Sequence, residues 1–469
     1  MRRLPAITLS FCISMHNPVL ATPLDGQTTV KTTFEAGLNL VAEDNLFWKL
    51  PSTFAPDIAY STNTTYLEEY IKPGVNLQFK RPLYTIYGRG SVVLSHSTGT
   101  DPYNEGNTGR ATLEEGYVGI KTNQNNAWNY DLSVGARTLK FGSGMLISNG
   151  GTSGFERGAL KLGPRKAWER SIIARLSRAE FNVTGYYIDP NELDSNNTDT
   201  RLYGFDINAP LFSNKGRWGM TFGHVIRSRS PYPKAALGGT DAPTIIENGR
   251  DGLNFVNHYG HATLYAHKGA VYFSQWDGAY QWNNNIDLRA WGGRIRLGST
   301  YHQFAWQPTL LYSWQTFSGD NPNTKRLERF DPLYFEGSPS AWSTGSKSSM
   351  VFINTNVYSH QLSLSLLPHQ QHQVKFRLAR INVNELKSPI QFGQASRLDF
   401  SDGISTVISG VTQRHLADDM FIEYTYIASH STYVTLGISK SIAGDAITST
   451  TDSYLPHWIG GFANIVMFW

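Results

Sequence analysis

The stretch Val30-Lys31-Thr32-Thr33-Phe34-Glu35-Ala36-Gly37-Leu38-Asn39-Leu40 decides the fold class of this chain. Its even positions are apolar apart from Thr32, whereas its odd positions carry Lys, Thr, Glu, Gly and Asn. In a β-strand, such alternation gives one apolar face and one polar face. The same rhythm returns in 128–137, 303–314, 362–366 and 434–439. The sequence therefore predicts many amphipathic strands separated by turns.

The alternation favours a membrane barrel over a soluble sandwich. No run of about 18 consecutive apolar residues occurs, which excludes a helical membrane span. The mean hydropathy of −0.33 is low, but in a barrel every lipid-facing residue is followed by a polar one. Aromatic residues make up 13% of the chain, as expected for girdles at two membrane interfaces. At about 25 residues per strand and connection, we predict an all-β fold, a transmembrane antiparallel up-and-down β-barrel of about 16 to 18 strands.

The connections between the predicted strands are of two kinds. Short turn clusters such as 123–126 and 213–216 alternate with longer polar stretches at about 95–110, 140–168, 228–258, 317–348 and 384–402. This asymmetry is typical of a periplasmic end with short turns and an extracellular end with long loops. The final apolar strand ends on the aromatic Trp469, which resembles the terminal signal that the outer-membrane assembly machinery reads. The sequence leaves open whether the long loops enter the lumen.

The N-terminus has the features of a secretory signal. Arg2 and Arg3 precede a largely apolar segment, and Val19-Leu20-Ala21 fits the small-x-small cleavage rule. We therefore expect a signal peptide over 1–21 and a single barrel domain over 22–469, located in a Gram-negative-type outer membrane. The only cysteine, Cys12, lies inside the signal and follows the large Phe11, which argues against lipidation. A mature chain without cysteine suits an oxidising compartment.

Strand parity predicts which basic side chains line the pore. A charge facing lipid at the bilayer centre costs about 2–4 kcal/mol, so basic residues opposite apolar ones should point inward. The predicted pore-lining residues are Lys80, Arg89, Arg137, Arg175, Arg294, Arg296, Lys375, Arg377 and, after a shift of phase in its strand, Arg380. Inward acids are fewer in the same strands: Glu35, Asp131, Asp206 and Glu423. Two interpretations follow, a net anion path or a ladder of ion pairs across the lumen.

Motifs for catalysis, metals and cofactors are not found. The sequence has no phosphate loop, no zinc-ligand spacing and no Gly-x-Ser-x-Gly elbow. The histidine pairs His258 with His261 and His369 with His372 lack a completing ligand set. We therefore expect no enzyme activity, catalytic residue, metal or cofactor. Basic residues are spaced along strands rather than clustered, so a nucleic-acid partner is not expected.

Three short motifs resemble the alginate-export family of outer-membrane porins. Residues 137–147, Arg-Thr-Leu-Lys-Phe-Gly-Ser-Gly-Met-Leu-Ile, are similar to that family's Arg-x-x-x-Tyr-Gly-x-Gly-Arg-Leu strand end. Ser-Gly-Asp at 318–320 with Phe-Asp-Pro-Leu-Tyr at 330–334 is similar to a family loop, and Trp-Ile-Gly-Gly at 458–461 fits the closing strand. Met145 departs from the pattern, because a basic residue is common there. The resemblance implies an 18-stranded barrel with an arginine-lined channel, which in the best-known members passes an anionic uronate polymer.

These observations predict an outer-membrane channel that passes anionic, carbohydrate-like or acidic solutes by passive diffusion. The expected partners are outer-membrane lipid and lipopolysaccharide, the outer-membrane assembly machinery, and a small or polymeric anionic solute. Two alternatives remain open at this point. One is a broad or hydrophobic-solute-selective porin, and the other is a non-transport barrel such as a lipid hydrolase or an adhesin.

Overall fold

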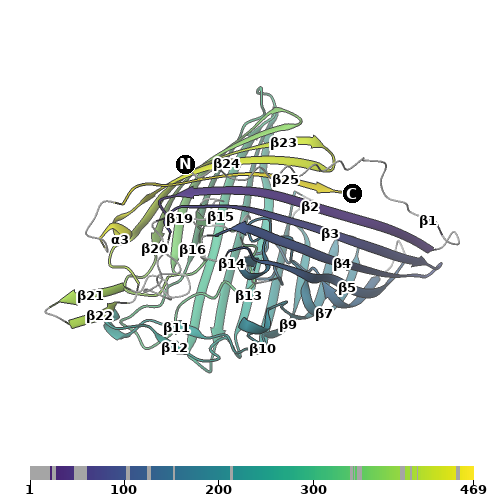
Figure 1. Cartoon of the computed structure of the whole chain (residues 1–469). Coiled ribbons are helices and arrows are strands. Elements are labelled where there is room, and N and C mark those ends of the chain that lie inside the picture. Colours follow the sequence, from purple (N-terminus) through teal and green to yellow (C-terminus); the bar gives the residue numbers. More distant parts are fainter. Residues whose placement is uncertain are drawn as a thin grey trace.

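The first and last long strands of the chain pair with each other and close the sheet. In the computed structural model, β2 (Thr28–Asp44) runs antiparallel to β25 (Trp458–Phe468), from the pair Glu35 and Phe468 to the pair Asp44 and Ile459. Every other wall strand pairs antiparallel with its neighbours in the chain, so 18 described strands form one closed barrel (Figure 1). This confirms the predicted fold class and its upper strand count.

The structure describes residues 22–23, 28–46, 61–101, 106–123, 128–151, 154–211, 215–337, 342, 344–345, 351–390, 397–401, 404–408, 410–449 and 455–469. The predicted signal peptide at 1–21 lies outside these residues. Among the described residues, no helix is both long and apolar enough to cross a membrane.

Sixteen further strands complete the wall between β2 and β25. They are β3 (Thr64–Lys80), β4 (Tyr84–Gly99), β5 (Gly109–Thr122), β6 (Asn129–Arg137), β7 (Trp168–Arg178), β8 (Phe181–Asp189), β9 (Arg201–Leu211), β10 (Gly216–Arg227), β13 (Asn254–His267), β14 (Ala270–Asn283), β15 (Leu288–Tyr301), β16 (Thr309–Phe317), β19 (Val357–His369), β20 (His372–Val383), β23 (His415–Ser429) and β24 (Thr432–Ala443).

Short elements lie outside the wall. β1 (Thr22–Pro23) pairs antiparallel with the start of β2, and three small hairpins lie in the connections. The hairpins are β11 (Tyr232–Lys234) with β12 (Thr244–Ile246), β17 (Thr344–Gly345) with β18 (Val351–Phe352), and β21 (Arg397–Ser401) with β22 (Ile404–Ile408). The short helical turns are α2 (Gly154–Arg157), η1 (Asp194–Asn196), η2 (Leu237–Gly239) and α3 (Asp445–Thr448).

Connections differ between the two ends of the barrel. At one end, two-residue turns suffice, as at Lys268 and Gly269, where both residues have positive φ (44° and 78°), which matches the twist of a tight hairpin. At the other end lie the long connections, including the hairpins β11–β12 and β21–β22 (Figure 1). We assign the short-turn end to the periplasmic side and the long-loop end to the extracellular side.

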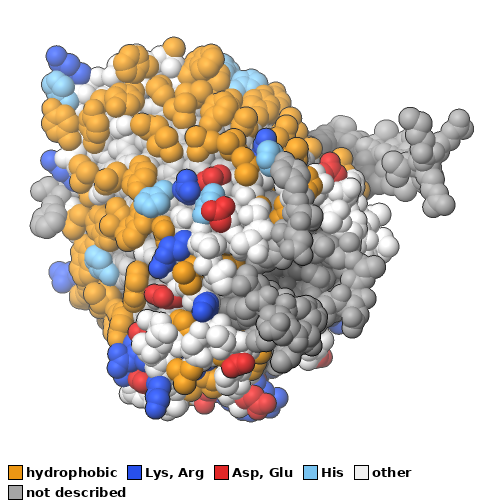
Figure 2. Space-filling model, turned by 90° about the vertical axis from the view of Figure 1, so that its left-hand side faces the viewer, with side chains coloured by type: hydrophobic (Ala, Val, Ile, Leu, Met, Phe, Trp, Pro, Cys, Tyr) orange, Lys and Arg blue, Asp and Glu red, His pale blue; other side chains and the backbone are white. Residues whose placement is uncertain are grey.

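Each wall strand turns one parity outward. On β15, Trp291, Ile295 and Leu297 are about half exposed, whereas Ala290 and Arg294, which have the opposite parity, are buried. Outward apolar side chains cover much of the face drawn in Figure 2. The outward side chains therefore form the surface that contacts lipid, and the inward ones face the lumen.

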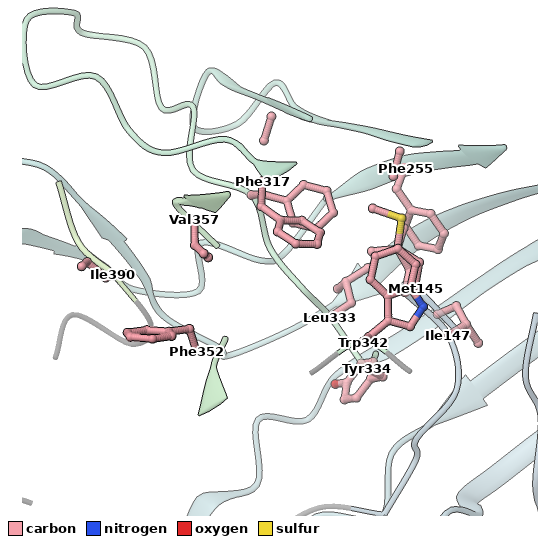
Figure 3. Packing of buried hydrophobic residues seen from close by; sticks show 14 of the residues in the cluster. Met145, Ile147, Phe255, Phe317, Leu333, Tyr334, Trp342, Phe352, Val357 and Ile390 are labelled. Carbon is pink, nitrogen blue, oxygen red and sulfur yellow. The ribbon is translucent and has the colours of Figure 1, made fainter. Parts of the chain in front are cut away.

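A hydrophobic core fills part of the barrel interior, a feature that the alternation did not predict. Connections bring Met145, Leu333 and Trp342 against inward residues of the wall such as Phe255 and Phe317. Figure 3 shows Met145, Trp342 and Phe255 gathered together. All five side chains are at most 8% exposed. The long loops thus fold into the lumen and pack there.

We predict that arginine is tolerated on one face of β24 and not on the other. Ile438 points outward near the middle of the strand, whereas Thr435 has the opposite parity. Ile438→Arg should lower the free energy of unfolding in lipid vesicles by about 2–4 kcal/mol, because it moves a charge into hydrocarbon. Thr435→Arg, which places its charge in the lumen, is the matched control and should lower the free energy of unfolding much less. Equal losses in denaturant titrations would contradict the assigned faces.

Candidate functional site in the lumen

Two loops that are far apart in the sequence meet inside the barrel. The first follows β6 and the second follows β16, and both carry motifs of the porin resemblance. The backbone N–H of Tyr334 donates to the carbonyl of Leu146 (3.0 Å), and that of Ser148 donates to the carbonyl of Tyr334 (2.9 Å). Ile147 and Tyr334 form a parallel bridge. The two loops therefore stabilise each other as one body that narrows the lumen.

A glycine allows the first loop to lie directly on the wall. Gly142 has φ 52°, a left-handed conformation, and a Cβ atom there would lie 2.6 Å from the ring of Tyr259 on β13. Glycine avoids both the backbone strain and the clash. Met145, which stands where the resemblance expects a basic residue, is 1% exposed and belongs to the hydrophobic core. At this position the chain contributes packing rather than charge.

Trp342 of the second loop covers a predicted pore arginine. The guanidinium carbon of Arg294 lies 3.6 Å from the centre of the Trp342 ring, and an Arg294 Nη2 lies 3.8 Å from Asp277 Oδ2. The indole N–H of Trp342 donates to Ser143 Oγ (2.9 Å), and this hydroxyl donates to Asp277 (2.6 Å). Arg294 is therefore held between a ring and a carboxylate.

A buried ion pair fixes the second loop to a neighbouring connection. Arg250 donates twice to Asp331, at 2.7 and 3.0 Å, and Gln281 exchanges two hydrogen bonds with the Asp331 backbone. Burial lowers the pKa of Arg250, but the adjacent Asp331 outweighs burial and the pKa is raised. In the same loop, burial raises the pKa of Asp320 to about 6, although the backbone N–H groups of Glu328 and Ala235 lower it. Such fully partnered polar groups make the loop rigid.

Two wall carboxylates hold the segment that leads into β7. Glu68 on β3 accepts the backbone N–H groups of Lys161 (2.9 Å) and Leu162 (3.1 Å). Glu114 on β5 accepts those of Lys166 (2.8 Å) and Ala167 (3.2 Å). A β-bulge makes Glu114 the extra residue of β5, with no partner on β4. Both carboxylates are fully buried, so segment 161–167 is fastened to the inside of the wall.

Two adjoining cavities lie beside the loops, with volumes of about 240 and 320 Å³. They share Gly142 and Tyr259, and their charged lining residues are Lys140, Arg175, Arg217, Arg294, Asp206 and Asp277. Four basic side chains therefore face two acidic ones. Asp206 accepts hydrogen bonds from Thr221 (2.7 Å), Tyr259 (2.9 Å) and Asn208 (3.0 Å). Lys140 pairs with Glu336.

Eight of the nine predicted pore residues have inward parity in the structure. They are Lys80, Arg89, Arg137, Arg175, Arg294, Arg296, Lys375 and Arg377.

Several of these eight side chains are engaged by acids or rings. Arg89 pairs with Glu115 (2.7 Å), and Arg377 pairs with Asp419 (3.6 Å). The guanidinium carbon of Arg137 lies 4.7 Å from the Tyr117 ring centre. The ladder of ion pairs that the sequence left open is thus present in part.

The remaining inward residues differ in their surroundings. Arg296 donates to Gln275 (3.3 Å), and Lys375 lies opposite Glu423 in the register of β20 and β23. Lys80 is exposed at the periplasmic end of β3. Arg175 is exposed within the smaller cavity, where its charge lies close enough to Asp206 to interact electrostatically.

Arg380 is a correction, because it faces outward. The pairing of β19 with β20 shows no shift in register from the pair Leu366 and Val374 to the pair Val357 and Val383. The expected change of phase therefore does not occur. Arg380 keeps the parity of Phe376 and Leu378, which are 38% and 53% exposed. The assumed change of phase would turn Ile381 and Val383 toward lipid, but both are fully buried.

Sequence reasoning missed Arg217 and Lys140. Arg217 lies between Gly216 and Trp218 on β10, and the outward parity of Trp218 and Met220 would have placed it inside. Lys140 lies in a loop, where no parity rule applies. Among the residues that the structure describes, no group of three or more His, Cys, Asp or Glu side chains could hold a metal ion.

The comparisons with solved structures agree with this architecture. OpdK from Pseudomonas aeruginosa is similar with a TM-score of 0.57 and 8% identity, over 94% of this chain and 98% of that one. OccAB4 from Acinetobacter baumannii is similar with a TM-score of 0.54 and 10% identity, over 94% of this chain and 99% of that one. OccK2 from Pseudomonas aeruginosa was solved in complex with glucuronate. It is similar with a TM-score of 0.51 and 10% identity, over 94% of this chain and 97% of that one. At such identities the likeness concerns the fold.

The closed barrel, its apolar outer face and these likenesses define an outer-membrane porin. Residues 262–460 match the family model described as alginate export. The fold and this match support the resemblance to an alginate-export-type outer-membrane porin that the sequence motifs predicted. The motif at 318–334 lies inside the matched residues, the motif at 458–461 extends one residue beyond them, and the motif at 137–147 precedes them. No curated protein sequence matches the chain significantly.

We predict that neutralising the two wall carboxylates opens the lumen. Glu68→Gln with Glu114→Gln replaces charge-assisted hydrogen bonds by neutral ones and should weaken loop docking by about 1–3 kcal/mol. Single-channel conductance in planar bilayers should rise. Glu69→Gln is the control, because Glu69 is the exposed neighbour with outward parity. A double variant that conducts like wild type would show that these carboxylates do not hold segment 161–167.

Proposed function

We propose that this porin passes small acidic solutes, carbohydrate-like in character, by passive diffusion through the space beside its lumenal loops. The observation that carries the proposal is the position of Arg175 and Arg217 at the two lumenal cavities. Neither arginine forms an ion pair among the described residues. Basic groups along a pore lower the barrier for anions.

The other charges of the site largely compensate one another. Arg294 lies beside Asp277, and Lys140 pairs with Glu336. Asp206 is occupied by three hydrogen-bond donors from the wall. Arg217 donates hydrogen bonds to the side-chain carbonyl of Asn208 (2.9 Å) and to the backbone carbonyl of Glu180 (2.6 Å). Both acceptor oxygens are uncharged. Arg175 and Arg217 then face only one further carboxylate, that of Asp206, so the site keeps an excess of one positive charge.

The lining also suits a hydroxylated solute. Asn182, Thr184, Asn208 and Tyr259 contribute neutral polar groups to the smaller cavity. Amide and hydroxyl groups of this kind hydrogen-bond sugars, while an arginine binds a carboxylate through two parallel N–H donors. A barrel of similar fold, OccK2, has been solved with the uronate glucuronate, which combines both chemistries. The alginate-export description of residues 262–460 supports the same class of solute.

We predict that Arg175→Ser with Arg217→Ser reduces anion selectivity. One charge at about 10 Å contributes about 0.4 kcal/mol in water-like surroundings, with opposite sign for anions and cations. The anion-to-cation permeability ratio, measured as a reversal potential in a salt gradient, should fall roughly fourfold to tenfold at low ionic strength. Sodium glucuronate should block the wild-type current and block the variant less.

Arg170→Ser is the matched control for this experiment. Arg170 lies on the same strand as Arg175 but has the opposite parity and is 68% exposed beside Glu169. A wild-type pore that prefers cations would contradict the proposal. A neutral pore that passes apolar solutes equally well would instead support a broad porin.

A further inference from the structure

The outer face of the barrel carries a polar row at the extracellular edge of its apolar surface. The row crosses five neighbouring strands, and each of its members is the cross-strand partner of the next. Its members are Trp314 on β16, His360 on β19, Arg380 on β20, Asp418 on β23 and Ile442 on β24. His360 and Arg380 are exposed. Figure 2 shows charged and histidine side chains gathered against apolar ones on the face where β20 and α3 lie in Figure 1. A row of this kind is unusual on a surface that contacts lipid.

The next row toward the periplasm is apolar except at one position. Its members, in register, are Tyr312, Leu362, Leu378, Met420 and Lys440. Between the two rows lies an open groove of about 380 Å³, lined by side chains of both rows. Lys440 is not part of the lining, but it has the outward parity of Leu436 and Ile438 and is the cross-strand partner of the lining residue Met420. A second basic residue therefore lies next to the groove, two strands from Arg380.

Arg380 and Lys440 form no ion pair among the described residues. The acid of the row, Asp418, lies 3.2 Å from Nε2 of His415. Nδ1 of His360 lies 2.8 Å from the hydroxyl of Tyr312. If that hydroxyl donates, the ring proton of His360 is on Nε2, which makes the imidazole a further donor toward the groove. The groove thus has basic groups and N–H donors above an apolar floor.

We propose that this groove binds a phosphorylated, multiply acylated lipid of the outer leaflet. Arg380 and Lys440 contact the phosphate groups, and the acyl chains lie along Leu362, Leu378 and Met420. Charge complementarity favours this occupant, because two basic side chains without an ion pair among the described residues lie beside a single acid, Asp418, which is next to His415. Strands lie about 4.8 Å apart, so two strands separate the basic residues by roughly 10 Å, which long side chains can bridge around one head group. The site is on the outer face and does not depend on the solute that the lumen carries.

The test uses the full-length folded protein in detergent and native mass spectrometry. The probe is a hexa-acylated diglucosamine lipid with two phosphates, compared with the same lipid without phosphates. We expect one phosphorylated lipid per barrel, bound roughly tenfold more tightly than the dephosphorylated one. Arg380→Gln with Lys440→Gln should abolish this preference, whereas R380K with K440R should keep most of it. Arg170→Gln, an outward arginine beside Glu169, should bind like wild type.

Only barrels that show heat-modifiable gel migration, and are therefore folded, are compared. If the double variant does not fold, R380Q and K440Q are measured separately, and each should weaken the phosphate preference. The proposal is overturned if wild type shows no phosphate preference, or if the Gln variants keep it. It is also overturned if the mass spectra show a second copy of the chain in place of the lipid.

Discussion

Backbone hydrogen bonding in hydrocarbon is the constraint on which this structure depends. Strands that cross a bilayer must pair every N–H and C=O group with another strand, and only closure leaves no unpaired edge. The pairing of β2 with β25 satisfies this requirement. Closure then gives each strand two environments, because successive side chains point to lipid and to the lumen. The apolar outer face, the inward basic residues and the outward position of Arg380 all follow from that alternation.

The lumen differs from the outer face in what it requires of the residues that lie in it. Loops that enter it must satisfy their own backbone groups, and the wall supplies acceptors for this purpose, notably Glu68 and Glu114. They also bury apolar side chains, so Met145 and Trp342 pack as they would in a soluble core. The arginines that meet these loops are largely neutralised, as Arg294 shows beside Asp277 and under Trp342. What distinguishes the proposed path is therefore the few basic groups that the loops and the wall acids leave without a counter-charge.

The sequence predicted the barrel well and the interior poorly. The alternation in 30–40 lies within β2, and the motifs at 137–147 and 330–334 marked the two loops that meet. Parity also placed eight basic residues on the lumen side. It failed at Arg380, where a change of phase was assumed although the pairing of β20 with β19 runs without a shift from Val374 to Val383. Ion-pair partners on neighbouring strands, such as Asp419 for Arg377, depend on register, and the inward course of the loops depends on contacts between distant segments. Neither can be obtained from local periodicity.

Single cysteines introduced one at a time along β24 test the central claim most directly, since Cys12 is the only cysteine of the chain. Each variant from 432 to 443 would carry a fluorescent label, and quenching by lipid-attached quenchers would be compared with quenching by a water-soluble, membrane-impermeant one. Our account predicts strict alternation, with lipid quenching strongest at 436 and 438 and aqueous quenching favoured at 435, 437 and 439. Quenching that varies smoothly along the strand, or that is aqueous at every position, would contradict a lipid-facing wall.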